Sequence, residues 1–425
     1  MTIQAASVRL LTDVRSCAIR QASAAGSAEP GLLAGKVTSM GVNVTAHRVR
    51  VLAVGMVAAV GAAAWIAPAA AWARPAVPAA SFSARGFLAS VAATSARNAW
   101  AVGQAGPAFS SKPRTLIARW DGKAWKRVPS PTPASGGSLY WVTVTSARRG
   151  WAVGETGSAT GTNTKTLILR WSGTSWSRVP SPTPAGGATL YGVAVTSARS
   201  AWAVGWAYRG QKTLILHWNG TAWSRVPSPT PAGGAVLTGV AAPSASSAWA
   251  VGWISSNSKA KTLILRWNGS AWSRVPSPTR VGGAALNAVA APSASSAWAV
   301  GCSACRSHQP KTLIVHWNGT AWARVPSPTP AGGALLTGVA ATSASSAWAV
   351  GSTGSEAGLK HKTVVLRWNG TAWTRVPSPT PAGGAILLSV AATSGRNAWA
   401  VGQTGTYTTS NPRTADLHWN GTTWK

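Results

Sequence analysis

The tetrapeptide Trp-Ala-Val-Gly occurs seven times in this chain of 425 residues. Its tryptophans are 51, 51, 47, 49, 50 and 51 residues apart, at Trp100, Trp151, Trp202, Trp249, Trp298, Trp348 and Trp399. A repeat of this length cannot bury its apolar face alone, so neighbouring repeats stack to form a common core. The period therefore predicts seven similar units packed against one another.

Each unit contains four short apolar runs separated by turn residues. In the sixth unit they are LLTGVAAT, SAWAVG, KTVVLRWNG and TAWTRVPSP, read in order from Leu335 to Pro379. The Asn-Gly pair in WNGTAW predicts a hairpin with a type I′ turn, in which both central residues have positive φ. Proline and Gly-Gly then close one unit and open the next. Four strands in about 50 residues predict an all-β fold, a seven-bladed β-propeller of four-stranded repeats.

Length variation among the units is confined to one loop. From the WAVG tryptophan to the threonine that opens the third strand the distance is 15, 15, 11, 13, 14, 15 and 15 residues, whereas from that threonine to the next WAVG it is always 36. In an antiparallel blade this loop lies on the same face as the connection between blades. Variable loops on a rigid scaffold often bind ligands.

The two ends of the chain carry a clue to how the ring closes. The seventh unit reaches Lys425 just as its fourth strand begins, and Ala71–Thr94 resembles the connection Ala321–Thr342 between two later units. A propeller must join its last blade to its first to remove open sheet edges. We therefore expect the N-terminal segment to supply the missing outer strand.

The segment before the repeats has the composition of a targeting sequence. Residues 51–73 carry no charge, follow His47, Arg48 and Arg50, and end in small residues. Read from Met40, residues 40–73 form a secretory signal peptide, and residues 1–39 are an upstream extension. Read from Met1, the same run is an uncleaved signal anchor behind a cytoplasmic tail. We expect residues 1–39 to be disordered, residues 74–425 to form the propeller, and the protein to be secreted or membrane-anchored with its propeller outside.

Acidic chemistry is scarce, since 39 Lys and Arg stand against 6 Asp and Glu and the net charge is +33. After Ala73 the acidic residues Asp121, Glu155, Glu356 and Asp416 occupy different positions of the repeat, whereas a glycosidase needs two carboxyl groups within roughly 5 to 10 Å. His217, His316 and His418 stand where other units carry arginine, which favours packing on a neighbouring ring over metal binding. The sequence thus predicts no enzyme, no cofactor and no metal site.

The full pattern W..VPSP…L..VAA.S…WAVG…LI..WNG..W resembles the Trp-rich repeat proteins of high-GC bacteria, and through them the kelch or galactose oxidase-like β-propellers. Tectonin-type propeller lectins share a looser form of it. The resemblance extends over about residues 74–425. It implies a propeller and carries little information about activity.

Two rows of basic residues recur with the period. One precedes the threonine of the third strand, at Arg114, Lys165, Lys212, Lys261, Lys311, Lys362 and Arg413. The other lies in the fourth strand, at Arg127, Arg178, Arg225, Arg274, Arg324 and Arg375. The first row suggests a ring of charge that binds an anionic polymer, or else serves solubility. For the second row we favour protection of the sheet edge.

Tryptophan and cysteine supply the remaining candidates. Three tryptophans per unit recur, and we expect them to form the core between blades. Trp206 and Trp253 instead follow a WAVG directly and enter a variable loop, where each either stacks on a sugar or base or covers a blade edge. Cys302 and Cys305 predict a local disulfide in an oxidising compartment.

These observations together predict an exported, non-catalytic binding module for anionic or carbohydrate polymers at the cell envelope. The alternative is an extracellular scaffold for a protein partner, and a propeller enzyme is a third, weaker reading. We expect a monomer whose contact with a membrane is limited to the N-terminal segment.

Overall fold

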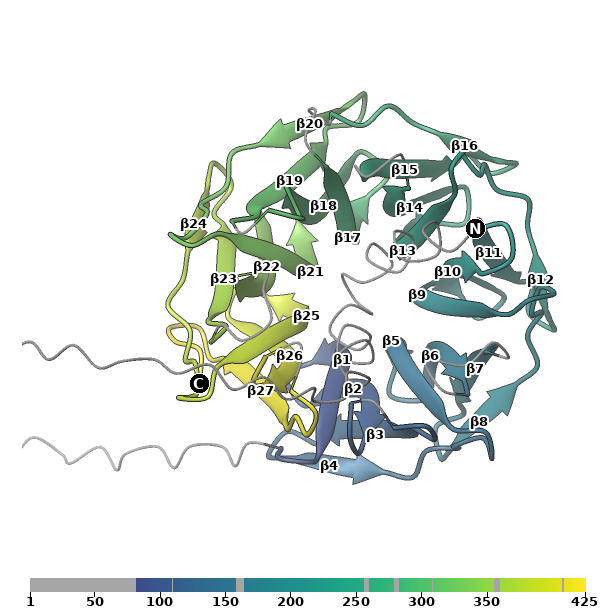
Figure 1. Ribbon diagram of the computed structural model, residues 1–425, viewed down its shortest axis with the longest axis horizontal. Helices are drawn as coiled ribbons and strands as arrows, with labels where there is room; N and C mark the ends of the chain where they lie inside the picture. The colour runs from purple at the N-terminus through teal and green to yellow at the C-terminus, as the bar shows by residue number, and fades with distance from the viewer. Residues whose placement is uncertain are drawn as a thin grey trace, which may run out of the picture. The chain divides into compact units, whose positions relative to one another are not determined.

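The computed structural model describes residues 82–425, apart from 109, 158–163, 256–259, 279–282, 308, 355–359 and 407–408. Its regular elements are all β-strands, and no helix occurs in the described residues. The strands form six four-stranded sheets and one three-stranded sheet, arranged as blades around a ring (Figure 1). The predicted seven-bladed β-propeller is confirmed. The predicted signal and upstream segments, residues 1–73, lie outside the described residues.

Four classes of strand build the blades. The first, innermost strands are β1 (Gly86–Ser95), β5 (Gly137–Ser146), β9 (Ala188–Ser197), β13 (Ala235–Ser244), β17 (Ala284–Ser293), β21 (Ala334–Ser343) and β25 (Ala385–Ser394). The second strands are β2 (Asn98–Ala105), β6 (Arg149–Thr156), β10 (Ser200–Ala207), β14 (Ser247–Ile254), β18 (Ser296–Ser303), β22 (Ser346–Thr353) and β26 (Asn397–Thr404). The third strands are β3 (Arg114–Trp120), β7 (Lys165–Trp171), β11 (Lys212–Trp218), β15 (Lys261–Trp267), β19 (Lys311–Trp317), β23 (Thr363–Trp368) and β27 (Thr414–Trp419). The fourth, outer strands are β4 (Trp125–Val128), β8 (Trp176–Val179), β12 (Trp223–Arg225), β16 (Trp272–Arg274), β20 (Trp322–Val325) and β24 (Trp373–Arg375).

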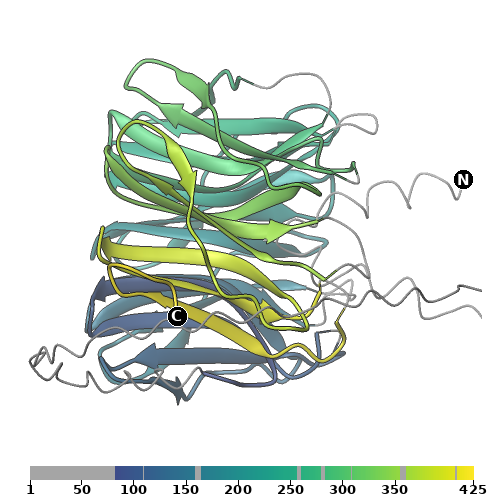
Figure 2. The same cartoon turned by 90° about the vertical axis from the view of Figure 1, so that its left-hand side faces the viewer.

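All neighbouring strands within a blade are antiparallel, so each connection emerges at one of two faces. The turns between first and second strands lie on one face, called here the hairpin-side face. The loops between second and third strands lie at the opposite ends of the strands, on the loop-side face. Figure 2 shows the ring from the side, with the strands running between these two faces. The loops of variable length therefore share one face, as the sequence predicts.

Tryptophans pack each blade against the next. The WAVG tryptophan of one blade contacts the third-strand and fourth-strand tryptophans of the following blade, as Trp249 does with Trp317 at 4.8 Å and Trp322 at 5.1 Å between ring centroids. The second contact is T-shaped, with an interplanar angle of 87°. Edge-to-face rings add to the gain from burying large apolar surfaces. The expected core between blades is confirmed.

The glycine of WAVG is required by the pleat of the neighbouring strand. Strand β1 has a bulge between Leu88 and Ser90 opposite Gly103. A Cβ atom on Gly103 would stand 2.0 Å from the carbonyl oxygen of Phe87. The same obstruction occurs at the other six WAVG glycines, at 1.8 to 2.0 Å. Any side chain at this position would push the first strand away from the second.

The Asn-Gly hairpin forms between the third and fourth strands, but not with the expected turn type. Gly220 has φ +105° while Asn219 does not have positive φ, so the type I′ prediction is wrong. Instead the Asn219 side chain oxygen accepts hydrogen bonds from the backbone N–H groups of Thr221 and Ala222. Asp121 makes the same two contacts in the first blade. Hydrogen bonds to the side chain thus hold this turn, and the residue before the glycine does not need the positive φ of a type I′ turn.

Ring closure uses both ends of the described chain. Trp424 pairs with Trp419 and lies 5.3 Å from the ring of Trp348, as the other fourth-strand tryptophans do. The C-terminal residues therefore begin the outer strand of the seventh blade themselves. The N-terminal segment lies beside β27, where Ala84 and Phe82 hydrogen-bond to Thr414. The residues expected to supply the rest of this outer strand, those before residue 82, lie outside the described residues, so that expectation stays a prediction.

Candidate functional site

Seven exposed cations encircle the loop-side face. Each lies at or just before the start of a third strand, and all seven predicted residues are exposed: Arg114, Lys165, Lys212, Lys261, Lys311, Lys362 and Arg413. Strand pairing fixes five of them opposite the last residue of the second strand, as Lys165 opposite Thr156. We call these seven residues the loop-side ring.

The next residue in each blade anchors the ring. In the fifth blade, Thr312 is buried and its hydroxyl lies 2.9 Å from the Ser327 hydroxyl and 2.8 Å from that of Thr329. Its backbone N–H also donates to Thr329. The Pro-Ser-Pro-Thr segment is thereby held against the start of the third strand. This contact explains why the segment recurs, and it gives the basic residue beside it a defined position.

The second basic row, in the fourth strands, is also exposed at all six positions. These arginines lie on the outer strands at the periphery of the ring (Figure 1). They are therefore spread around the circumference, whereas the loop-side ring is on one face. The two rows carry similar charge in different places.

Trp206 and Trp253 do not lie in the variable loops. Strand β10 continues to Ala207 and β14 to Ile254, so both tryptophans are still within a strand. Their exposed fractions are 8% and 3%. They belong to a cluster that includes residues from the first strands of all seven blades, which places it at the centre of the ring. This burial favours packing over stacking on a ligand, and the predicted ligand contact of the two tryptophans stays a prediction.

A polar group that the sequence did not reveal lies in this central region. Glu155 is fully buried, and its carboxylate accepts hydrogen bonds from the hydroxyls of Tyr140 at 2.8 Å, Tyr208 at 3.1 Å and Thr189. The acceptor belongs to the second blade and two of its donors to the third. These three hydroxyl donors satisfy the hydrogen-bonding capacity of the buried carboxylate. None of these residues is common to all seven blades, so the period did not indicate that they would come together.

Trp141 also departs from the repeat. It is the fifth residue of its first strand, where other blades carry Ser90, Gly192 or other small residues. Its side chain packs both on the core between the second and third blades and on the core between the fifth and sixth. One tryptophan therefore reaches across the centre of the ring.

The three histidines of the third strands pack on tryptophans. The ring of His316 lies 4.1 Å from that of Trp298, and His217 lies 4.3 Å from Trp202. Arginines occupy the same place in other blades, as Arg266 does 5.3 Å from the Trp249 ring. Burial lowers the pKa of His217, His316 and His418 below the ordinary value. The predicted packing role is confirmed.

Cys302 and Cys305 lie at the end of β18 and in the loop after it. A disulfide joins them, with 5.3 Å between the Cα atoms. Cys302 is fully buried in the central cluster, so the bridge ties this loop to the centre of the ring. No group of three or more His, Cys, Asp or Glu side chains comes together in the part of the chain that the structure describes.

Comparisons with known proteins identify the fold. No family model matches the chain, so the likeness to kelch-like propellers is one of sequence pattern, and no curated protein matches it either. Among solved structures it is similar to a polysaccharide lyase, an ulvan lyase, at a TM-score of 0.54 and 9% identity over 81% of this chain and 96% of that one. It is similar to a GH74 xyloglucanase from Xanthomonas campestris at 0.51 and 14%, over 81% of this chain and 55% of that one. A structure of YCF48 with a bound D1 peptide has a TM-score of 0.48 and 13% identity over 79% and 96%.

Two of these structures correct the sequence-based exclusion of catalysis. The ulvan lyase and the xyloglucanase are enzymes, so a ring of this kind does not by itself mark a protein as non-catalytic. Function on a shared fold is decided by the site and not by the architecture. At these identities the comparisons establish the fold, and the chain is a seven-bladed β-propeller with Trp-rich repeats.

Proposed function

We propose that this protein binds anionic polymers with its loop-side ring. The observation that carries the proposal is the exposure of one cation per blade at equivalent positions of seven blades. A polymer with regularly spaced charges can contact several of these positions at once, which a small ligand cannot. Polymers of this class include teichoic acid, acidic glycans and extracellular DNA.

The distribution of the described acidic residues supports this proposal, while Glu356 lies outside the described residues. Asp121 pairs with Lys126 at 2.7 Å in a turn between third and fourth strands, at the opposite ends of the strands from the ring. Glu155 is buried among hydroxyl groups, and Asp416 accepts a hydrogen bond from the N–H of Phe82. None of the seven ring cations forms an ion pair with another described residue. Their charge is therefore available to a polyanion.

The location of the protein forms part of the same proposal. The uncharged run in residues 51–73, preceded by basic residues, favours export, and wall polymers and extracellular DNA are encountered outside the cytoplasm. No helix among the described residues is long and apolar enough to cross a membrane. In this proposal any membrane contact involves the N-terminal segment alone.

Salt dependence provides the test, because each neutralised phosphate releases counterions. For duplex DNA the slope of log K against log salt concentration is about −0.9 for each contact. We would replace Lys165, Lys212, Lys261, Lys311 and Lys362 by Gln and measure binding to a DNA duplex and to dextran sulfate over a range of KCl concentrations. We expect binding to weaken more than tenfold and the slope to become shallower.

A variant with five fourth-strand arginines replaced by Gln is the matched control. Changing Arg127, Arg178, Arg225, Arg274 and Arg324 removes the same charge from the periphery. We expect this variant to retain most of the affinity. Equal losses in the two variants would show that net charge alone governs binding, and the proposal would then be wrong.

A further inference from the structure

The second blade departs from the repeat at its hairpin-side face. Its second strand begins with Arg149 and Gly150, whereas the other blades begin with Asn or Ser followed by Ala. In four other blades that first residue contacts the residue before the third-strand tryptophan. Asn98 accepts a hydrogen bond from Arg119 at 3.3 Å, and Ser200 lies 3.1 Å from the His217 ring nitrogen. In the second blade a cation replaces this polar neutral partner.

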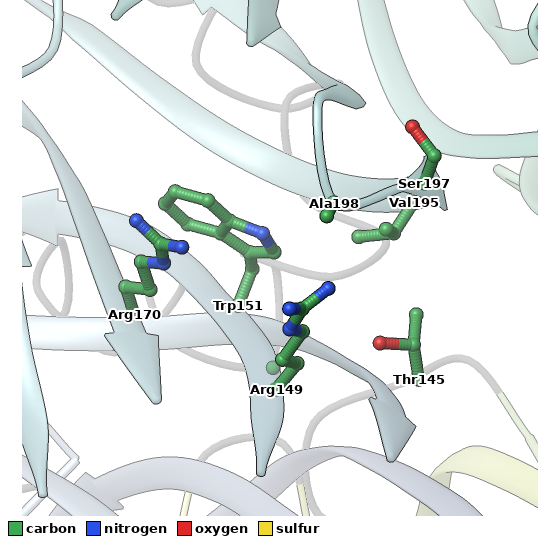
Figure 3. A pocket seen from close by; sticks show the side chains of 8 residues that line it. Thr145, Arg149, Trp151, Arg170, Val195, Ser197 and Ala198 are labelled. Carbon is green, nitrogen blue, oxygen red and sulfur yellow. The ribbon is translucent and has the colours of Figure 1, made fainter. Parts of the chain in front are cut away.

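A small cleft of about 20 Å³ lies at this place, between the second and third blades. Arg149 and Arg170 both line it, on two sides of the Trp151 indole (Figure 3). The Arg170 guanidinium is held over the rings of Trp151 and Trp218, at 5.5 and 5.7 Å from their centroids. Gly150 lines the cleft without a side chain. The volume suits one small group and not a sugar ring.

The charges around this cleft are all of one sign. No carboxylate lines it, and both of its arginines are exposed. Arg148 and Arg199, in the hairpin turns of the second and third blades, add two further exposed cations nearby. Guanidinium groups gathered without an anion repel one another, and a bound oxyanion removes that repulsion through charge-assisted hydrogen bonds.

These arginines are not needed to make the hairpin. The equivalent of Arg148 is Ser246, Ser295 or Ser345 in the fourth, fifth and sixth blades, and those blades form the same turn. The equivalent of Arg149 is serine in the third to sixth blades. Arginine occupies the Arg148 position in the three remaining blades, so Arg149 is the cation that is specific to the second blade, and it lines the cleft.

The geometry points to a binding site for one tetrahedral oxyanion, a phosphate or sulfate group, in the cleft that Arg149 and Arg170 line. Two guanidinium groups supply donors for several oxygens, and Thr145 and Ser197 add hydroxyls to the lining. Trp151 and Val195 provide apolar surface for the carbon skeleton of an ester. The site lies at the opposite ends of the strands from the loop-side ring, so it stands independently of the proposed polymer binding.

Isothermal titration calorimetry of the full protein with inorganic phosphate, inorganic sulfate and glucose 6-phosphate tests this assignment at low, constant chloride concentration. We expect saturable binding that Arg149→Ser weakens at least tenfold. The matched control is Arg148→Ser, which removes the same charge from the neighbouring turn and should change the affinity less than threefold. No saturable binding to the unaltered protein, or equal losses in the two variants, would overturn the assignment.

Further measurements separate the possible ligands and guard against misfolding. Binding of a phosphate monoester should strengthen as the pH rises through about 6, where its second proton is lost, whereas sulfate binding should not change. If Arg149→Ser fails to fold, Arg170→His is the substitute, since His217 and His316 occupy that place in other blades. Unchanged phosphate and sulfate binding in Arg170→His would also overturn the assignment. Binding should persist when the lysines of the loop-side ring are replaced by glutamine.

Discussion

Six junctions between blades differ from the seventh. At six, the chain runs directly from the fourth strand of one blade into the first strand of the next, while the closing junction between the seventh and first blades has no such connection. The apolar contacts are nevertheless equivalent, because Trp399 packs in one cluster with Trp120 and Trp125. The polar contacts differ, since Thr414 meets Phe82 and Ala84 where Thr312 meets Ser327 and Thr329.

The comparison shows that tryptophan packing, and not chain connectivity, is common to the whole ring. The closing junction also contains an acidic residue at a core position. Asp416 lies two residues after the threonine of its third strand. The other blades carry a fully buried Ile or Val at this position, such as Ile314 and Val365. Burial raises its pKa from 3.8 to about 6, against the opposing effect of the hydrogen bond from Phe82. The stability of the closing junction should therefore fall as the pH rises through about 6.

The largest effect should come from removing a WAVG tryptophan. Trp249→Ala at a connected junction and Trp399→Ala at the closing junction should each lower the free energy of unfolding by about 3 to 5 kcal/mol, the cost of truncating a buried tryptophan. Unfolding in guanidinium chloride measures both. Only Trp399→Ala should also speed trypsin cleavage after Arg85, which pairs with Arg413 in the intact ring. Similar cleavage rates in the two variants would mean that the closing junction is no weaker than the others.

A smaller effect is expected from Asp416→Asn, which keeps an acceptor for the Phe82 N–H and removes the charge. Because the folded-state pKa is raised, the folded protein holds the proton longer than the unfolded chain. The stability linked to this group is fully present below pH 4 and is lost as the pH rises through about 6. At 1.36 kcal/mol per pKa unit, the rise from 3.8 to about 6 corresponds to about 3 kcal/mol, so the variant should be more stable by about 3 kcal/mol at pH 8 and about equally stable at pH 4. Denaturant unfolding at the two pH values measures this difference.

His418 requires a control, because it lies two residues away and titrates in the opposite direction. Burial lowers its pKa, so the stability it contributes is present above its unfolded-state pKa and lost as the pH falls. Comparing Asp416→Asn in a His418→Arg background removes this contribution, and Arg119 and Arg170 show that arginine fits the position. A gain in stability that did not depend on pH would contradict the assignment to Asp416.

The closing junction also shows what sequence periodicity can and cannot predict. The seven blades, the four strands in each and the tryptophan core follow from the period, because each repeated residue has an equivalent environment in every blade. Trp206 was misplaced because pattern alone did not show that its strand continues two residues beyond WAVG. Glu155, Tyr208 and Trp141 meet their partners at the centre of the ring. Such contacts join residues that do not repeat, so the period of the sequence cannot predict them.

The smallest effect should distinguish the polar contacts of the two kinds of junction. Thr312→Val and Thr414→Val each remove hydroxyl hydrogen bonds, at a cost of about 1 kcal/mol. Thr312 binds a segment that is joined to a strand at each of its ends. Loss of the Thr312 hydroxyl should therefore loosen only residues near Ser327. Thr414 binds Phe82 and Ala84, which no chain connection joins to the seventh blade. Hydrogen exchange at the Ala84 amide, which donates to the Thr414 hydroxyl at 2.9 Å, should therefore accelerate in Thr414→Val and stay unchanged in Thr312→Val. Equal protection in both variants would indicate that the backbone bonds of Gly86 to Pro412 and of Thr414 to Ala84 suffice to hold the closing segment.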